Sequence, residues 1–460
     1  MGIKKVLSGL RDESGQTAVT AELGLLLIVG FVALGIDVGH LYTVRRQVQI
    51  AADAAAIAAA LEIQPCAGAT NCSKMNTAAQ AALVENGLTG SSVASNCAAS
   101  TSGGLVITVN DPPCAMGTRD PNHGKSGYVE VTVGEAAPTF FGKILGISTM
   151  PVLARAEATR VGGGNCIYAL DPTAINAVSV DLLAVVNSNC GIVDESNSPF
   201  AFGCNLLAAV NVSQIRVNGG AESLLCGISP NPTTNAGVPT PADPLAYLPK
   251  PTVPQCGTST SSPYYGSSAP LTIVGTAVLD PSFAYCGGIT ILPTANVTFM
   301  PGTYVIKSTQ GILGINPGGL SIALGANISG SGVTFYNYGP SGGVTFLLPS
   351  VTLGSVNLTA PTSGTYSGVL FFQDPGDTAP ATILGSTSLN SKLEGAFYFP
   401  TARVSYAVSG PAKYDIIVAD DIDFVLLTFA GSSSQTSFGS DYSGLASGSP
   451  LAGGKVALVQ

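Results

Sequence analysis

Tryptophan is absent from this sequence of 460 residues, histidine occurs twice, and charged residues make up 10% of the chain. Ordinary globular domains carry about 25% charged residues, so the composition is unlike that of a helix-rich soluble enzyme. The two histidines, His40 and His123, stand far apart, and the sequence contains no CxxC pair. Neither a Ser/His/Asp or Cys/His catalytic set nor a zinc site is therefore indicated. We expect no enzyme activity, no metal ion and no cofactor.

Basic residues are also scarce, with 18 Lys and Arg against 27 Asp and Glu. Residues 161–460 contain 7 bases and 15 acids, a net charge of −8. Such a surface repels a polyanion, which argues against nucleic acid as a partner. Glycine, with 56 residues, and proline, with 30, are abundant instead. The length suffices for two or three modules with separate cores.

Cysteine is missing from the first 65 residues, whereas ten cysteines follow. An even number confined to one side of an apolar segment favours disulfides formed in an oxidising compartment. Proximity in the sequence suggests five pairs, although the first four cysteines alone permit three pairings. The suggested pairs are Cys66 with Cys72, Cys97 with Cys114, Cys166 with Cys190, Cys204 with Cys226, and Cys256 with Cys286.

An uncharged apolar run, LGLLLIVGFVALGI, extends from Leu23 to Ile36. With its polar ends it widens to residues 18–44, enough to cross a bilayer. Burial of Asp37 against a partner helix would help this segment to span the membrane. A cleaved secretory signal is the alternative, but no small-x-small site follows at the usual distance. We expect a retained transmembrane helix, with residues 1–17 in the cytoplasm and the cysteine-bearing bulk outside it.

Residues 45–65 continue the helical pattern beyond the membrane and are rich in alanine, as in IAADAAAIAAAL. Small side chains let neighbouring structure approach closely. This helix therefore packs either on its own module or on copies of itself in an assembly.

Residues 66–161 predict a small α+β module, because a short helical pattern is followed by runs of alternating apolar and polar residues. The PTFF turn running into GKILGI predicts a short helix with both phenylalanine rings pointing inward. The other expected elements are a helix at Thr77–Glu85 and strands at Leu105–Val109, Tyr128–Val133 and Met150–Val161.

Residues 162–460 consist of short β-branched runs separated by Gly, Asn, Ser and Pro, as in GITILPTANVTFMPGTYVI. Single runs recur about every ten residues and paired runs about every twenty, which predicts a parallel β-solenoid (β-helix) with stacked coils. A β-sandwich or jelly roll is the alternative, but the Asn-Gly and Asp-Gly turns of its hairpins are nearly absent.

The series GQTAVTAELGLLLIVGFVALGIDVGHLYTVRRQVQIAADAAAIAAAL combines an apolar helix with D-x-G-x-x-Y, a basic pair and an A-A-D-A-A-A helix. In this it resembles the TadG-like (TadE/TadG-type) proteins of the Flp, or tight-adherence, pilus system. Later stretches are similar to the same family, among them P-T-F-F followed by A-R-A, and G-V-L-F-F-Q-D in the β-repeat. The motif residues are Asp37, Gly39, Tyr42, Arg45, Arg46, Ala51, Ala52 and Asp53.

The resemblance implies an accessory component of Tad-type pilus assembly, held by one helix in the bacterial inner membrane and acting structurally with other Tad/Flp proteins. The expected fold class is mostly β, with an N-terminal transmembrane helix, a small α+β pilin-like module and a parallel β-solenoid-like repeat. Type IV prepilins carry Glu five residues after the Gly of their cleavage site, but Thr20 stands at that distance from Gly15. We therefore expect an unprocessed N-terminus.

Two other functions stay open. A solenoid face rich in Thr, Ser, Asn, Tyr and Gly suits an adhesin that binds a glycan or matrix surface. A polysaccharide-degrading β-helix enzyme needs clustered carboxylates, but a solvated strand edge accounts for the same acids, and the nearest base in the sequence is Lys413. His123, in DPNHGKSG, is typical of a solvated loop. The candidate carboxylates are Asp420, Asp421 and Asp423, then Asp374 and Asp377.

Overall fold

The computed structural model describes residues 13–63, 66, 70–89, 93–97, 105–125, 127–161, 164–238, 242–253, 270–307, 319–339, 343–347, 354–386, 392–409, 412–426, 435–446, 448–452 and 455–459. The chain divides into two compact units. The first contains Met1–Ala60, Thr70–Thr159 and Ala457–Gln460, and the second contains Leu61–Ala69 and Arg160–Val456.

Helix α1 (Glu13–Leu61) is 49 residues long and changes character along its length. Its apolar side chains from Val19 to Val38 are largely exposed, whereas its alanine-rich end is buried along one face. Gln49 Nε2 donates a 2.9 Å hydrogen bond to the carbonyl oxygen of Arg155 in the same unit. Alanine favours the helix and permits close approach, so this end packs on its own unit. The buried alanines are Ala51, Ala52, Ala55, Ala56, Ala59 and Ala60.

A second helix and a five-stranded sheet complete the first unit. Helix α2 (Ser73–Glu85) buries Met75, Ala79 and Leu83 and ends at Asn86. Strands β3 and β4 form a long antiparallel hairpin in which Val131 lies opposite Ala156. The sheet order is β1-β2-β3-β4-β32, with β1 at Val93–Ala94, β2 at Val106–Asn110, β3 at Tyr128–Pro138, β4 at Thr149–Val161 and β32 at Lys455–Leu458. The sequence predicts a β-repeat over all of residues 162–460, but β32 belongs to this sheet.

The second unit is built from short strands, most of them three to six residues long. The early strands are β5 (Asn165–Ala169), β6 (Val178–Val180), β7 (Val185–Ser188), β8 (Gly191–Asp194), β9 (Phe202–Cys204), β10 (Ala209–Asn211), β11 (Ile215–Val217), β12 (Ala221–Ser223) and β13 (Gly227–Ser229). The middle strands are β14 (Leu271–Ile273), β15 (Thr276–Leu279), β16 (Ala284–Cys286), β17 (Ile289–Ile291), β18 (Asn296–Phe299), β19 (Gly302–Lys307), β20 (Leu320–Ile322), β21 (Asn327–Ser331), β22 (Val333–Tyr338) and β23 (Val344–Leu347). The late strands are β24 (Ser355–Thr359), β25 (Val369–Gln373), β26 (Ala381–Ser386), β27 (Lys392–Phe399), β28 (Val404–Ser409), β29 (Asp415–Ala419), β30 (Ile422–Phe424) and β31 (Gln435–Phe438).

Every ladder among the described strands of this unit is parallel, and most strands pair with the strand three places further along the chain. This excludes the antiparallel sandwich that the sequence left open. The parallel pairing agrees with the scarcity of Asn-Gly and Asp-Gly dipeptides in this region, because the two-residue turns that they form can join only antiparallel strands.

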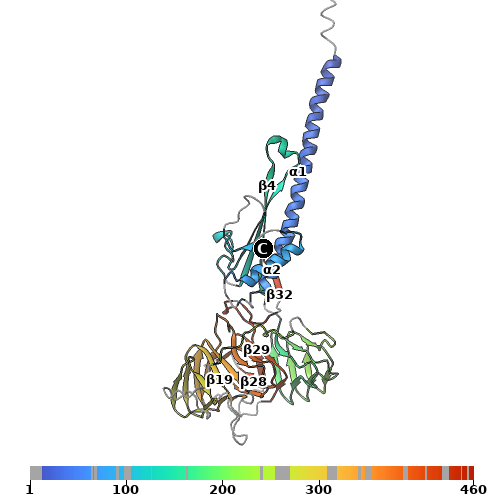
Figure 1. Cartoon of the computed structure of the whole chain (residues 1–460). Coiled ribbons are helices and arrows are strands. Elements are labelled where there is room, and N and C mark those ends of the chain that lie inside the picture. The colour runs from blue at the N-terminus through green and yellow to red at the C-terminus, as the bar shows by residue number, and fades with distance from the viewer. Residues whose placement is uncertain are drawn as a thin grey trace, which may run out of the picture. The chain divides into compact units, whose positions relative to one another are not determined.

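The order of strands in the sheets differs from the order along the chain. One sheet runs β11-β8-β5-β29-β27-β24-β21-β18-β15, so the late strand β29 lies beside the early strand β5. In the same way β30 pairs with β6, and β31 pairs with β7. Figure 1 shows the result, with the red and orange strands lying between the green and the yellow ones. The first and last strands of the unit are therefore neighbours, and we call the boundary between them the seam.

Aromatic side chains fill the interior of the sheets in register. Tyr304, Phe335, Phe371 and Phe397 occupy paired positions on successive strands. The ring centroids of Phe335 and Phe371 are 5.3 Å apart, and those of Phe371 and Phe397 are 5.5 Å apart. We call these four residues the aromatic ladder. Because parallel strands repeat their side-chain positions, one well-packed ring position recurs from strand to strand.

Disulfides join three of the pairs that sequence proximity suggests, namely Cys97–Cys114, Cys166–Cys190 and Cys204–Cys226. Cys66, Cys72 and Cys286 are also disulfide-bonded. Cys256 lies outside the described residues.

Candidate functional site

The tip of the β3–β4 hairpin is a compact turn beside helix α1. It contains the 3₁₀ helix η3 (Gly142–Leu145), which ends at Gly146 in the left-handed region with φ of 82°. Ile147 N donates to the Gly142 carbonyl at 2.9 Å. A side chain at Gly142 would approach the Thr139 hydroxyl to 2.9 Å and the Ile147 carbonyl to 3.1 Å. Glycine is therefore required at both positions, which fixes the shape of the tip.

Asp37 of α1 holds this tip through its carboxylate, which accepts hydrogen bonds from three successive backbone N–H groups. Oδ1 lies 2.7 Å from Phe140 N and 3.1 Å from Phe141 N, and Oδ2 lies 3.0 Å from Phe141 N and 2.6 Å from Gly142 N. The side chain is buried, with 7% of the residue exposed. These N–H groups begin η3, so the carboxylate caps it as an N-terminal anion does. The partner of Asp37 is thus a hairpin of its own unit, where the sequence analysis suggested a partner helix.

The two phenylalanine rings of the tip point outward, so the prediction that both are directed inward is wrong. Phe140 is 59% exposed and Phe141 is 38% exposed. The Phe140 ring contacts His40 of α1 edge-on, with centroids 4.9 Å apart. The backbone N–H groups of Phe140 and Phe141 are hydrogen-bonded to Asp37. This backbone orientation turns the two rings away from the sheet. The sequence gives no sign of a contact between residues so far apart.

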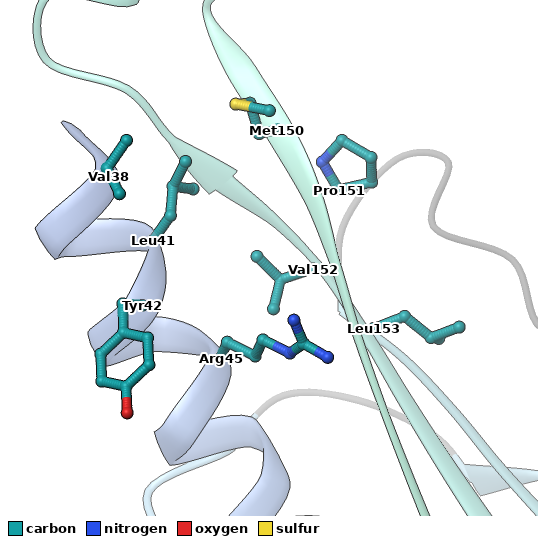
Figure 2. A pocket seen from close by; sticks show the side chains of 8 residues that line it. All are labelled: Val38, Leu41, Tyr42, Arg45, Met150, Pro151, Val152 and Leu153. Carbon is teal, nitrogen blue, oxygen red and sulfur yellow. The ribbon is translucent and has the colours of Figure 1, made fainter. Parts of the chain in front are cut away.

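Two other motif residues of α1, Tyr42 and Arg45, line a groove next to the hairpin. Figure 2 shows the groove between the helix and the start of β4. Tyr42 and Arg45 form part of the helix wall, and both side chains are exposed. Gly39 accepts a 3.0 Å hydrogen bond from the Thr43 hydroxyl through its carbonyl, and Arg46 is exposed. The groove has a volume of about 390 Å³ and is lined by Val38, Leu41, Tyr42, Arg45, Met150, Pro151, Val152 and Leu153.

The remaining motif residues belong to the alanine-rich end of α1. Ala51 and Ala52 are fully buried, which explains why small residues are needed there. Asp53 is half-buried and accepts a 2.8 Å hydrogen bond from Gln49 Nε2 one turn earlier. These three residues support the packing of α1, whereas Asp37 fixes the position of the hairpin tip.

A buried charge cluster joins β3, β4 and the segment that precedes β3. The Arg155 guanidinium forms ion pairs with Asp120, with Glu130 at 2.5 Å and with Glu157 at 3.3 Å. Burial acts to raise the pKa of Glu130, but the backbone N–H groups of Ala115 and Cys114 and the guanidinium together hold it below its usual value. Burial and the neighbouring Asp120 raise the pKa of Glu157. One arginine thus compensates three carboxylates, which gives the A-R-A strand of the sequence motif a structural role.

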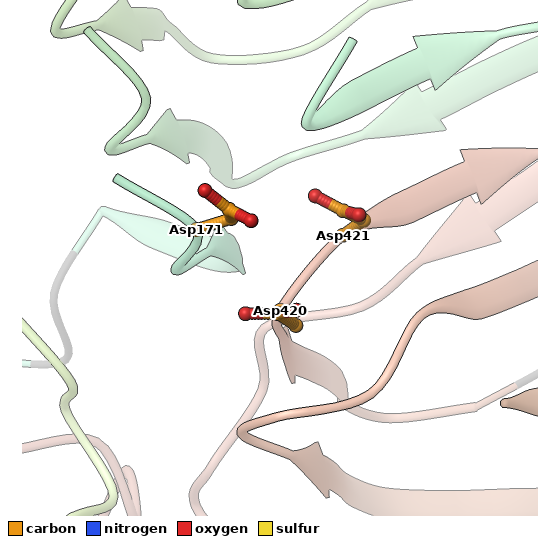
Figure 3. Close-up of side chains that lie close together, drawn as sticks. All are labelled: Asp171, Asp420 and Asp421. Atoms are coloured by element: carbon orange, nitrogen blue, oxygen red, sulfur yellow. The ribbon is translucent and has the colours of Figure 1, made fainter. Parts of the chain in front are cut away.

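Three carboxylates meet in the second unit where β5 and β29 end (Figure 3). Single oxygens of Asp171, Asp420 and Asp421 all lie within 4.8 Å of one another. Burial and the neighbouring Asp421 raise the pKa of Asp420 to about 6. Arg403 forms ion pairs with Asp421 at 3.0 Å and with Asp423 at 3.6 Å. The nearest base in space is therefore Arg403, not the Lys413 that the sequence indicated.

The other candidate carboxylates, Asp374 and Asp377, also have structural partners. Asp374 accepts a 2.5 Å hydrogen bond from the Tyr336 hydroxyl and pairs with Lys250 at 3.1 Å. Asp377 is buried and accepts a 3.0 Å hydrogen bond from Ala379 N. The structure does not bring these two residues into the cluster of Asp171, Asp420 and Asp421. His123 lies exposed in a loop.

The first unit defines a class of protein in which a long apolar helix continues into a folded α+β unit and is fastened to it by a buried aspartate. The helix is long and apolar enough to cross a membrane, with a mean hydropathy of 2.3 in its most apolar window. Residues 15–62 match the family described as putative Flp pilus-assembly TadE/G-like. The chain therefore carries a TadE/G-like domain over α1, which confirms the resemblance seen in the motif. No curated protein and no solved structure matches the chain.

Proposed function

We propose that the protein is a membrane-anchored accessory component of Flp/Tad pilus assembly and that it acts structurally. The observation that carries this proposal is the TadE/G-like helix itself, in which the motif aspartate fastens an exposed apolar segment to a folded unit. A helix joined rigidly to its unit fixes that unit's distance from the membrane. A flexible tether would not.

The exposed part of α1 fits the thickness of a bilayer. The helix is apolar and exposed from Val19 to Ile36, and at 1.5 Å per residue this stretch spans about 27 Å. The hydrocarbon core of a bilayer is about 30 Å thick. This match supports a single membrane crossing that ends near Asp37.

The distribution of cysteines supports the orientation. Every cysteine follows the helix, and the described disulfides lie on this C-terminal side. Disulfides persist in an oxidising compartment, so both folded units belong outside the cytoplasm and the N-terminus inside it. In a bacterium this supports the inner membrane as the location of α1.

The second unit acts as a stacked β-solenoid in this proposal. In a coil with three strands per turn, each strand is expected to pair in parallel with the strand three places later in the chain, as β6 pairs with β9. The same spacing is found for β8 with β11 and for β18 with β21, and successive turns of such a coil stack about 4.8 Å apart. Such a stack supports a positional role rather than a catalytic one. The ion pairs of Asp421 and Asp374 account for these carboxylates as structural groups.

The test is complementation of a deletion strain with the full chain, followed by counting pilus fibres and measuring surface attachment. We expect deletion to abolish fibres and the native chain to restore them. Asp37→Ala is expected to restore few fibres at equal membrane abundance, whereas Glu222→Ala, a change at an exposed acid of the second unit, restores them fully. Co-purification with Tad membrane proteins provides the second readout. Intact fibres with lost attachment in the deletion strain would favour the adhesin and contradict an assembly role.

A further inference from the structure

The tip of the β3–β4 hairpin carries an exposed apolar surface. Ile144 and Leu145 are each 81% exposed, and Phe140 and Ile147 are also largely exposed. Lys143 is the charged residue among them and is exposed too. Large apolar side chains that are this exposed and adjacent usually mark a surface that is covered in the cell. We call residues 140–147 the apolar tip.

The position of the apolar tip along α1 is fixed. The hydrogen bonds of Asp37 hold Phe140, Phe141 and Gly142 at one level of the helix. This is the level at which the exposed apolar stretch, Val19 to Ile36, ends. Figure 1 shows the hairpin tip beside α1, with the helix continuing beyond it. The exposed apolar side chains of the tip therefore begin at the level of α1 where the exposed apolar stretch of the helix ends.

We propose that the apolar tip inserts into the membrane that α1 crosses, in the leaflet facing the folded units, as a second and shallow lipid contact. Ile144 and Leu145 enter the boundary between headgroups and acyl chains, and Lys143 reaches the lipid phosphates. This inference rests on the membrane anchoring proposed above and extends it from one contact to two.

The chemistry of the neighbouring residues fits a lipid surface. Arg45 and Arg46 of α1 and Lys143 of the tip are exposed cations near the end of the apolar stretch, and Tyr42 is exposed beside them. Basic and aromatic side chains gather at the interface between a bilayer and water, where cations attract anionic headgroups. Interfacial elements bury their apolar face about 5–10 Å into this boundary. A hairpin pinned at the end of the spanning segment reaches this depth.

The absence of tryptophan from the chain allows a direct test with single tryptophans. We would place one each at Leu145 in the tip, at Leu27 in the middle of the exposed apolar stretch, and at Val84, an exposed apolar position on α2. Each full-length variant is reconstituted at one chain per nanodisc in phosphatidylcholine and phosphatidylglycerol. Bromine on the lipid acyl chains quenches nearby tryptophans, and its position along the chain reports their depth.

We expect L145W to lose most of its fluorescence with bromine near the glycerol and less with bromine near the terminal methyl. L27W shows the reverse order, and V84W is not quenched. Ile144→Trp serves as a second reporter and should behave as L145W does. If L27W is quenched while L145W and I144W emit as V84W does, the tip lies in water and the inference is wrong, although the anchor stands. If L27W is not quenched either, the membrane anchoring fails and the tip insertion with it.

Discussion

The Asp37 carboxylate shows how one side chain can fix the relation between a helix and a hairpin. It receives three consecutive backbone N–H groups, which would otherwise need water or another cap at the start of η3. Its charge strengthens each hydrogen bond, and its buried position keeps water from competing. Asparagine offers one acceptor oxygen and no charge, so it replaces this arrangement only in part.

Substitution of Asp37 should therefore loosen the tip without unfolding the unit. In Asp37→Ala we expect the amides of residues 140–142 to exchange hydrogen at least about tenfold faster, as the loss of local hydrogen bonds predicts. Asp37→Asn should lie between the alanine variant and the native chain. Hydrogen exchange of the reconstituted protein measures this, with the amides of β2 as an internal reference. Equal exchange in all three proteins would contradict the capping role.

Arg155 differs from Asp37 in its role. Its positive charge compensates the negative charges of three buried carboxylates, whereas Asp37 brings a negative charge to backbone N–H groups. Arg155→Met leaves Asp120, Glu130 and Glu157 buried without their cation. Loss of one partner from a buried ionic group costs about 3–5 kcal/mol in the free energy of unfolding. Urea unfolding followed by circular dichroism should show this loss at pH 7 and a smaller loss at pH 5, where Glu157, whose pKa is raised, accepts a proton more readily. Arg119→Met, at an exposed position of the same unit, is the control and should change little.

At the scale of the element, strand β8 and the connections of the second unit contain buried acids whose ionisation the fold opposes. Burial, with nearby carboxylates, raises the pKa of Asp194 and of Glu195 to about 7. Burial raises the pKa of Asp377 to about 6, with Asp374 adding to the effect. An acid whose pKa is raised by folding does not oppose folding at low pH, where it is protonated in both the folded and the unfolded state. As the pH rises, the unfolded chain releases its proton first, so the free energy of unfolding falls until the pH has passed the folded-state pKa.

The second unit should therefore be more stable at pH 5 than at pH 8. We expect its free energy of unfolding to fall by about 3 kcal/mol or more over this range, since one pKa unit at one group corresponds to about 1.4 kcal/mol. The pKa of Asp374 is lowered, so this group makes the free energy of unfolding rise with pH, but only at pH values more acid than this range. Asp194→Asn should reduce the dependence, because asparagine does not ionise. Denaturation midpoints at several pH values test this, and a midpoint that rises from pH 5 to pH 8 would contradict it.

The aromatic ladder predicts where the sheets are most sensitive to substitution. Phe371 is buried and stacks between Phe335 and Phe397. Phe371→Ala should lower the free energy of unfolding by about 3–5 kcal/mol because it leaves a cavity, and Phe371→Leu should cost less. Phe200→Ala, at a half-exposed ring of the same unit, provides the comparison and should cost little. An equal loss of unfolding free energy in Phe371→Ala and Phe200→Ala would show that the aromatic ladder does not contribute more to stability than an exposed ring.

Sequence reasoning located most of the elements but not their partners. The alternation in Tyr128–Val133 and Met150–Val161 predicts β3 and β4, since strand periodicity is a local property. The pairing of β29 with β5 joins Ile417 to Ile167, and no local pattern encodes so distant a contact. The rings of Phe140 and Phe141 were misplaced for a similar reason. The sequence predicts burial for these rings because they are apolar. That they face away from the sheet follows only from the hydrogen bonds between their backbone N–H groups and Asp37, which the sequence does not reveal.

At the scale of the whole molecule, the disulfides make stability depend on the compartment. Cys166–Cys190 closes a sequence separation of 24 residues, and loops of this size contribute about 3 kcal/mol. Cys166→Ser with Cys190→Ser should lower the unfolding midpoint by a corresponding amount. When native membranes are dissolved in denaturant, which exposes these buried residues, their thiols should react with a maleimide only after reduction, as mass spectrometry of the peptides will show. Labelling without reduction would place the second unit in a reducing compartment.

The seam between β5 and β29 determines how the second unit bears a mechanical load. The polypeptide enters this unit at β5, which lies inside its sheet between β8 and β29, and its last strand, β31, lies at the end of another sheet beside the early strand β7. Tension applied between the two ends of the unit would therefore act across the ladders at this seam, which pair β5 with β29 and β7 with β31. Strands β11 and β15, at the two ends of the largest sheet, lie away from these ladders.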